Sequence, residues 1–305
     1  MRDAQSTGPA LKPWQTILGT LSAALAGALL AWAGSDNSAS ALGDIPLFAL
    51  CVAGAFAIQW LAYIPAQLLK SERFFDLTGA ATYILALGTA LLLAAEWDLR
   101  RVVLFALVTI WAVRLGGFLF VRIQQSGGDG RFDRIKLSAP WFLMAWTLQG
   151  LWVSLTAACA LAAITSMHSE APDISLGLGV ILWAAGFLIE VAADRQKAHF
   201  NARPENTGAF IRTGLWAWSR HPNYFGEILL WFGIAVAAAP ALGGFQLICL
   251  ISPLYVSLQL TRISGINMLT ARGLKKWGDE PAYREYLAET PALIPAAPKH
   301  RTAPS

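Results

Sequence analysis

Long apolar stretches dominate this chain, and short polar segments separate them. A transmembrane α-helix needs about 20 mostly apolar residues to cross the hydrocarbon core of a bilayer. The break at Pro240 predicts a tight helical hairpin between the last two stretches. The pattern therefore predicts an all-α, polytopic membrane bundle of about seven or eight transmembrane helices. We expect one membrane domain over residues 1–295 and a flexible tail at 296–305. The predicted spans are 16–33, 45–69, 77–95, 102–121, 140–164, 174–193, 224–239 and 242–260.

The composition excludes most other classes of protein. Of the 305 residues, 56% are hydrophobic and 14% are charged, whereas soluble domains are about 45–50% apolar and about 25% charged. A disordered chain is excluded too, because disorder needs low hydrophobicity. The net charge of +4 forms no basic stripe or motif, so no nucleic-acid partner is expected. The three cysteines lie in apolar runs without CxxC spacing and the histidines lack metal-ligand spacing, so no metal site is expected.

The basic residues indicate how the chain is oriented. With a cytoplasmic N-terminus, 20 of the 23 Lys and Arg residues fall in cytoplasmic segments. Arg100 and Arg101 fall on the other side, and Arg114 lies within a span. This positive-inside pattern predicts that both termini are cytoplasmic. The first apolar stretch has a second interpretation as a cleaved signal peptide, because Arg2 and Lys12 precede a run that ends Ala-Trp-Ala.

Ionisable residues inside the spans are candidates for function, because a charge in the bilayer interior is costly. Arg114 lies eight residues before Arg122, which places both near one helix face. Glu190 and Asp194 lie four residues apart and also share a face. These groups bind a polar ligand, or Arg114 forms a structural ion pair with an acid.

The segment 194–227, DRQKAHFNARPENTGAFIRTGLWAWSRHPNYFGE, is the most informative part of the sequence. We expect a helix to begin at or near Pro222, because proline is favoured at the first helical position. The free N–H groups of that helix start, together with Arg220 and His221, form a predicted anion site. Asn223, Tyr224 and Glu227 follow on the membrane side, where polar groups need partners. Lys197 and Arg212 are well explained without a ligand, as basic residues that flank a span on the cytoplasmic side.

The C-terminal segment predicts a short amphipathic helix. Asp279 or Glu280 before Pro281 resembles a helix start, and Tyr283, Tyr286 and Leu287 then share one face. This helix either lies in the membrane interface or covers the cytoplasmic mouth, with the tyrosines against a ligand.

Together these motifs resemble a known family. The run GLWAWSRHPNYFGE at 214–227, the preceding Asp-Arg-Gln-Lys at 194–197, the Arg-Ile-Ser-Gly-Ile at 262–266 and the Tyr-x-x-Tyr tail closely resemble the steroid 5-alpha-reductase C-terminal domain family. More narrowly, the chain is similar to the bacterial membrane-protein branch of this family, which has no assigned function, and the resemblance covers residues 45–295. The RHPxYxG element alone is also found in isoprenylcysteine and phospholipid methyltransferases.

The resemblance implies a helical bundle that holds NADPH in a cytoplasm-facing cavity and reduces an activated C=C bond of a lipophilic enone. The family's cofactor contacts fall on Asp194, Asn223 and Arg262, with Glu227 alongside. The motif match together with the anion-site argument adds Arg220, His221, Tyr224, Tyr283 and Tyr286. Further phosphate or ribose partners are Lys197, Arg203, Asn206, Arg114 and Arg122, because the 2′-phosphate of NADPH needs cations.

The sequence departs from the family in the catalytic region. A Gln-Glu pair that meets the substrate carbonyl in the steroid reductases has Gln59-Trp60 as its nearest candidate here. The family's catalytic Tyr is replaced by Trp111 or has moved. Tyr63, one turn beyond Gln59, is our candidate to polarise a carbonyl and deliver a proton.

Two other functions stay open. An S-adenosylmethionine-dependent methyltransferase has the same kind of core, but that group carries a Glu-Glu pair where this chain has Ser264-Gly265-Ile266-Asn267. A non-enzymatic transport or lipid-binding protein is the second alternative, although no internal repeat is visible. The expected partners of the protein are a lipophilic small-molecule substrate and membrane lipid, and the expected location is the bacterial inner membrane.

Overall fold

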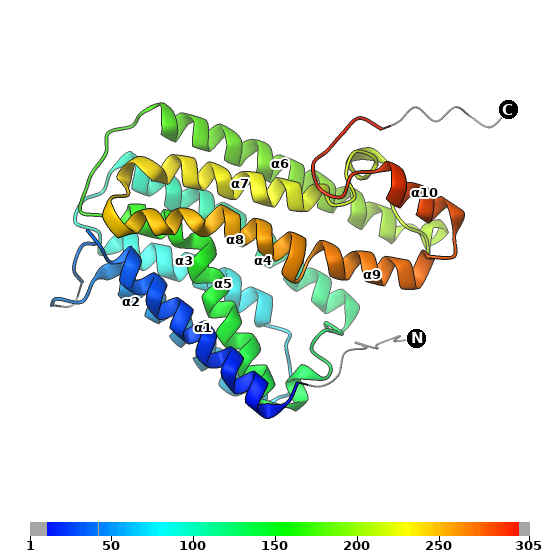
Figure 1. The fold of residues 1–305 in the computed structure, drawn as a ribbon, viewed down its shortest axis with the longest axis horizontal. Coiled ribbons are helices and arrows are strands. Elements are labelled where there is room, and N and C mark those ends of the chain that lie inside the picture. The colour runs from blue at the N-terminus through cyan, green and yellow to red at the C-terminus, as the bar shows by residue number, and fades with distance from the viewer. Residues whose placement is uncertain (1–10, 42, 299–305) are drawn as a thin grey trace. The chain divides into compact units, whose positions relative to one another are not determined.

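The computed structural model describes residues 11–41 and 43–298, and their regular elements are all helical (Figure 1). Only two isolated β-bridges occur among the described residues. The predicted all-α fold is therefore confirmed. The long helices are α1 (Pro13–Gly34), α2 (Leu47–Leu68), α3 (Phe75–Leu92), α4 (Leu99–Ser126), α5 (Ala139–Thr165), α6 (Ile174–Ala202) and α7 (Pro222–Ala238). Shorter ones are α8 (Ser252–Leu258), α9 (Ile266–Trp277) and α10 (Pro281–Glu289).

Among the described residues, eight helical segments are long and apolar enough to cross a membrane, and each overlaps one of the eight predicted spans. Large apolar side chains cover their outer surfaces. In α1, for example, Leu21, Leu25 and Leu29 follow each other at four-residue spacing and are each about 60% exposed. A face of this kind is stable against lipid and unfavourable in water. The chain is thus a multi-pass integral membrane protein.

The described residues group into two compact units. The first comprises the chain up to Leu176 together with Ala237–Ser252, and the second comprises Gly177–Val236 together with the chain from Pro253. The prediction of one membrane domain over 1–295 stays a prediction. The predicted tail, 296–305, lies mostly outside the described residues.

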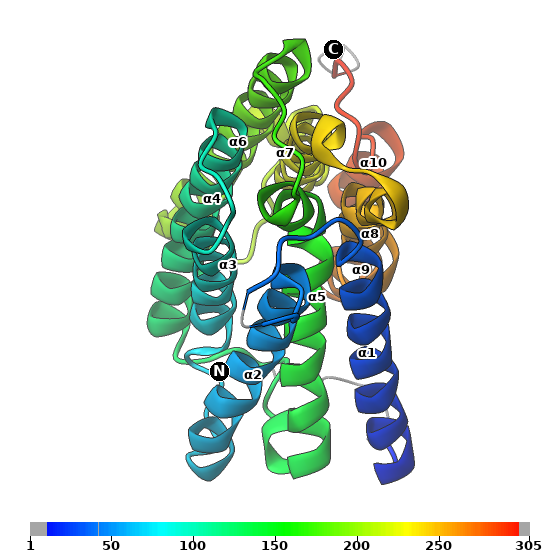
Figure 2. The ribbon, with the colours of Figure 1, turned by 90° about the vertical axis from the view of Figure 1, so that its left-hand side faces the viewer.

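Helix α5 forms the centre of the first unit. It runs between α1 and α2 (Figure 2) and is the most buried of the eight candidate spans. Small residues allow the helices to approach closely: a Cβ on Gly150 would lie 3.3 Å from the Phe56 backbone. The three cysteines are buried, as expected for core positions, and the Cys159 thiol donates to the Cys249 carbonyl oxygen at 2.9 Å.

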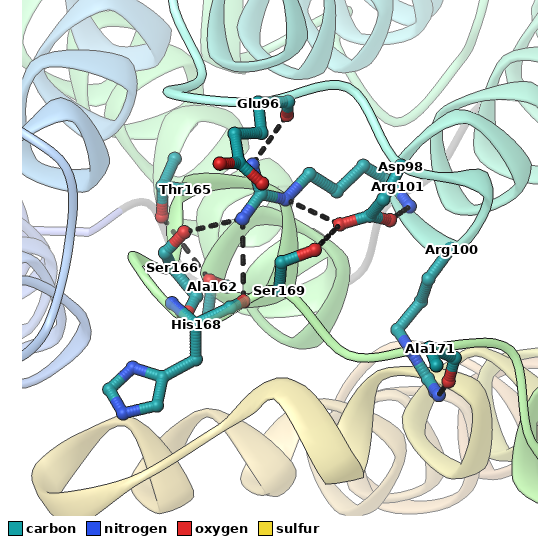
Figure 3. Close-up of polar contacts among 10 residues, drawn as sticks. All are labelled: Glu96, Asp98, Arg100, Arg101, Ala162, Thr165, Ser166, His168, Ser169 and Ala171. Atoms are coloured by element: carbon teal, nitrogen blue, oxygen red, sulfur yellow. Dashed lines mark hydrogen bonds and ion pairs between the residues drawn. The ribbon is translucent and has the colours of Figure 1, made fainter.

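Arg100 and Arg101, the two basic residues predicted on the non-cytoplasmic side, are almost completely buried at the start of α4 (Figure 3). Asp98 caps this helix by accepting a hydrogen bond from the Arg101 backbone N–H at 2.9 Å. The two guanidinium groups donate to carbonyl groups that helix ends and a connecting segment leave unpaired. This structural role explains why both depart from the positive-inside pattern. The acceptors are Glu96, Ser166 and His168 for Arg101, and Ala171 and Ala237 for Arg100.

In the second unit, α6 and α7 cross at glycine contacts. A Cβ on Gly186 would lie 2.5 Å from the Gly226 carbonyl oxygen. A Cβ on Gly233 would lie 2.6 Å from the Gly179 carbonyl oxygen. The glycines on each helix are seven residues apart, so they share one face. Small residues at such a crossing let two membrane helices pack backbone against backbone.

The last span differs from a uniform α-helix. It begins as a 3₁₀-helix over Gly244–Ile251, continues as α8 and ends as a π-helix over Gln259–Ile263. After a break at Ser264 and Gly265 the chain forms α9, a helix that the sequence analysis did not predict. The predicted C-terminal amphipathic helix is confirmed as α10, with Glu280 at its N-cap.

Candidate functional site

The start of α7 and the later turns of α6 bring together two of the predicted site residues. Helix α7 begins at Pro222, as predicted. The side-chain amide of Asn223 donates to an oxygen of Asp194 at 3.2 Å. The Asn223 amide oxygen is buried and accepts no hydrogen bond from any described residue. A buried acceptor without a donor is costly, so this atom is suited to a ligand that brings a donor.

Two further carboxyl groups lie close to this pair. Glu190 and Glu227 are both almost fully buried. The glycine crossing sets their positions, because a Cβ on Gly226 would lie 2.7 Å from the Glu190 backbone nitrogen. Helix α6 runs eight residues past Asp194, so Glu190 and Asp194 lie inside the helix and not at its end. Asp194, Asn223 and Glu227 were predicted to bind the cofactor. Glu190 was predicted only to share a helix face with Asp194.

Arg220 and His221 form the turn before α7. The C-terminal segment fixes this turn, because the Arg220 backbone N–H donates to the Pro291 carbonyl at 2.8 Å and the Ser219 hydroxyl donates to that of Leu293 at 2.8 Å. The Arg220 Nε is buried and donates to no described acceptor. It is thus a second buried polar atom able to meet a ligand.

His221 is 8% exposed and stacks on Tyr224, with ring centroids 5.4 Å apart. Burial, followed by the positive charges of Lys197 and Arg220, lowers the pKa of His221 to about 3. The imidazole is therefore neutral at physiological pH. Lys197 and Arg220 both lie close enough to act on the imidazole, and their positive charges favour an anion at this turn.

Trp216 joins the 214–218 turn to α6. Its indole N–H donates to the Ala193 carbonyl at 3.0 Å, and the Lys197 ammonium lies 4.5 Å from the ring centroid. Gln196 accepts a hydrogen bond from the Leu215 backbone N–H at 2.9 Å. The positioning roles of Gln196 and Trp216 were not predicted from the sequence. Both lie within the segment 194–227, but their partners are backbone atoms, which leave no signal in a residue pattern.

The tyrosines of α10 lie in an aromatic cluster with Phe210 and Trp277. Tyr283 and Tyr286 are each 6% exposed, and the Tyr286 hydroxyl donates to the Trp216 carbonyl at 2.8 Å. Burial raises the pKa of both tyrosines, and the charge of Arg220 offsets part of this effect. These contacts pack α10 over the 214–218 turn, and the choice between an interfacial helix and a lid stays open. Direct contact of these tyrosines with a cofactor stays a prediction.

Arg262 lies in the π-helix that ends the last span, and its side chain is exposed. No described acidic side chain forms an ion pair with it. The backbone is specialised here: the Ser264 N–H donates to the Gln259 carbonyl at 3.0 Å, and a Cβ on Gly265 would overlap the Leu260 carbonyl oxygen. The π-turn therefore requires glycine at 265 and holds Arg262 in an irregular segment, as is common at functional sites.

Arg203 and Asn206 follow the end of α6. Arg203 is exposed, and the Asn206 amide donates to the Phe200 carbonyl at 2.9 Å. The amide donor of Asn206 thus stabilises its own loop, whereas the Arg203 guanidinium points to solvent.

The remaining predicted residues, Gln59, Tyr63, Arg114 and Arg122, belong to the first unit. Gln59 is fully buried and donates from its amide nitrogen to the Thr82 hydroxyl at 2.8 Å, and its amide oxygen accepts no hydrogen bond from the described residues. The Gln59 amide oxygen is an acceptor, whereas a group that polarises a substrate carbonyl must donate a hydrogen bond. In this arrangement the Gln59 donor is already engaged by Thr82. The Tyr63 hydroxyl donates to the Ala139 carbonyl at 3.2 Å.

Arg114 is half-buried and lies 5.4 Å from the Phe118 ring, and Arg122 is exposed.

Residues 62–290, about three quarters of the chain, match the model of a family described as protein of unknown function (DUF1295). The chain belongs to the DUF1295 family. The DUF1295 match includes every candidate site residue except Gln59, which precedes it. It also ends before the Pro291 and Leu293 carbonyls that fix the turn at Arg220. No curated protein and no solved structure matches the chain.

Proposed function

We propose that this DUF1295 protein is a membrane-embedded, NADPH-dependent reductase of an activated C=C bond in a lipophilic, steroid- or lipid-like enone. The proposal rests on the resemblance to the steroid 5-alpha-reductase C-terminal domain family. The observation that carries it is the Asn223–Asp194 pair, whose buried amide oxygen accepts no hydrogen bond from the described residues. The buried Nε of Arg220, three residues earlier in the chain, likewise has no described acceptor. A buried acceptor without a donor is costly, and a ligand that brings a donor would remove this cost.

The donor set suits NADPH. Its phosphates need cations, and Arg220 and Arg262 offer guanidinium groups for them. The planar guanidinium of Arg donates two parallel hydrogen bonds to a phosphate, whereas the ammonium of Lys acts as a point charge. The Asn223 amide oxygen is an acceptor for a ribose hydroxyl or an amide N–H. Asp194 fixes the orientation of the Asn223 amide, so that the nitrogen is engaged and the oxygen is presented.

NADPH, when bound, supplies the hydride. The protein itself has three roles: it binds the cofactor, excludes water and protonates the reduced substrate. His221 is neutral, so it adds no fixed charge and leaves anion attraction to Arg220 and Lys197. Exclusion of water follows from the apolar helices around the polar residues. Tyr63 is our candidate proton donor, because its hydroxyl carries a proton that it now donates to a backbone carbonyl.

A cofactor comparison tests the proposal. We would purify the full chain in detergent and record thermal unfolding with NADPH, NADH, S-adenosylmethionine or no addition. Stabilisation by NADPH that saturates supports the reductase. Stabilisation by S-adenosylmethionine alone contradicts it and favours the methyltransferase, and stabilisation by none of them favours the transport or lipid-binding protein.

A further inference from the structure

Helix α9 lies in the C-terminal region, and the proposed reductase does not use it. It begins directly after the break at Gly265, and its sequence, INMLTARGLKKW, has no acidic residue. The candidate span that contains it, Gly244–Trp277, is 34 residues long, whereas about 20 residues cross the hydrocarbon core. About a dozen residues therefore extend past the core, and these are the residues of α9.

The two sides of α9 differ in burial. Ile266 and Gly273 are buried, and the Tyr283 ring packs against Gly273, where it leaves no room for a Cβ. Three exposed cations lie around the rest of the helix: Lys275 is opposite Gly273, and Arg272 and Lys276 lie between these two positions. None of the described acidic side chains forms an ion pair with these three cations.

Apolar side chains accompany the cations on the exposed side. Met268 is 38% exposed and Leu274 is 48% exposed. Trp277 ends the helix, and the Lys276 ammonium lies 4.4 Å from its ring centroid. Basic and apolar side chains on the exposed surface of one helix are typical of a segment in the membrane interface.

Helix geometry directs these cations toward the bilayer. The N-terminal end of α9 is the end joined to the span, and the Cα–Cβ bonds of a helix tilt toward its N-terminus. The long side chains of Arg272, Lys275 and Lys276 thus lean back toward the lipid headgroups, which they are able to reach.

We infer that the exposed side of α9 binds the phosphate groups of anionic phospholipids, on the membrane face where the span ends. A cation near an anionic membrane surface contributes about fivefold in affinity. Three such cations give roughly 100-fold. The three cations are not among the predicted cofactor-binding residues, so the inference does not depend on the reductase proposal.

The experiment compares two triple variants of the full chain in nonionic detergent. Arg272→Gln/Lys275→Gln/Lys276→Gln removes the three cations of α9. Lys12→Gln/Lys70→Gln/Arg73→Gln removes three exposed cations from other segments predicted on the same membrane face. Each protein is titrated with phosphatidylglycerol or phosphatidylcholine while thermal unfolding is recorded, in low and in high salt.

Phosphatidylglycerol is expected to stabilise the wild type and the control variant more than phosphatidylcholine does. The α9 variant is expected to bind phosphatidylglycerol roughly 100-fold more weakly, and high salt should remove the preference in all three proteins. Equal stabilisation by the two lipids in the wild type would overturn the inference, as would an unchanged preference in the α9 variant. NADPH binding is measured in parallel, and its loss in the α9 variant without loss of lipid preference would assign these cations to the cofactor.

Discussion

Gly226 of α7 and Gly186 of α6 pack backbone against backbone, so that a Cβ on Gly226 would lie 2.6 Å from the Gly186 carbonyl oxygen. This contact keeps α6 and α7 close enough for Asn223 to reach Asp194. The glycines thus shape the site without touching a ligand.

Gly226→Val should separate the two helices. Backbone atoms cannot yield as a flexible side chain would, so we expect a loss of about 1–3 kcal/mol in the free energy of unfolding. Thermal or denaturant unfolding in detergent measures this loss. Gly177→Ala is the matched control, because a Cβ at position 177 of α6 meets nothing within 4 Å. Equal stability of the two variants would contradict the close crossing.

His221 should make stability depend on pH. Its pKa is about 3 in the folded protein and about 6.5 in an unfolded chain. Between these values the unfolded state binds more protons, so stability falls as the pH falls from 6.5 toward 3. At pH 5 the loss is about 1–2 kcal/mol. His221→Phe keeps a ring against Tyr224 and should unfold with a weaker pH dependence over this range.

The measurement is the melting temperature between pH 7 and pH 5. His199→Gln, which changes an exposed histidine of α6, serves as the control. If His221→Phe and the wild type lose the same stability over this range, the imidazole is not buried beside Lys197 and Arg220.

Arg100 should be important for the fold of the first unit. Its guanidinium donates to the Ala237 carbonyl and pairs with Asp173 at 2.9 Å. Arg100→Met leaves buried carbonyl groups without donors, so we expect a loss of about 2–4 kcal/mol. Unfolding in detergent tests this, with Arg73→Met at an exposed position as the control. A stability equal to that of the control would show that these carbonyls find other donors.

Much of the fold could be predicted from the sequence because the bilayer simplifies the problem. The lengths of the apolar stretches predicted the eight spans, and Pro222 predicted the start of α7. The 3₁₀ and π segments of the last span were not predictable, because they differ from an α-helix in backbone hydrogen bonds and not in apolar pattern. Helix α9 was missed because its mixed basic and apolar sequence lacks a long apolar run.

The site was predictable only in part. The motif placed Asp194 and Asn223 in one segment, but their contact joins residues 29 apart and depends on the crossing of α6 and α7. The burial of Arg100 and Arg101 escaped prediction because most of their partners are backbone carbonyls, the farthest 137 residues away. Tyr283 and Tyr286 show the limit of periodicity, because one aromatic face fits both a lid and a packed helix.

The most direct test of the central claim is a fluorescence titration of the purified protein with NADPH. We predict saturable binding to the wild type and binding at least about tenfold weaker in Asn223→Ala and in Arg262→Ala, because each removes a hydrogen-bonding or charged group from the site. Asn201→Ala and Arg284→Ala, at exposed positions of the second unit, should bind as the wild type does. Absence of saturable NADPH binding to the wild type, or equal binding by all four variants, would contradict the account.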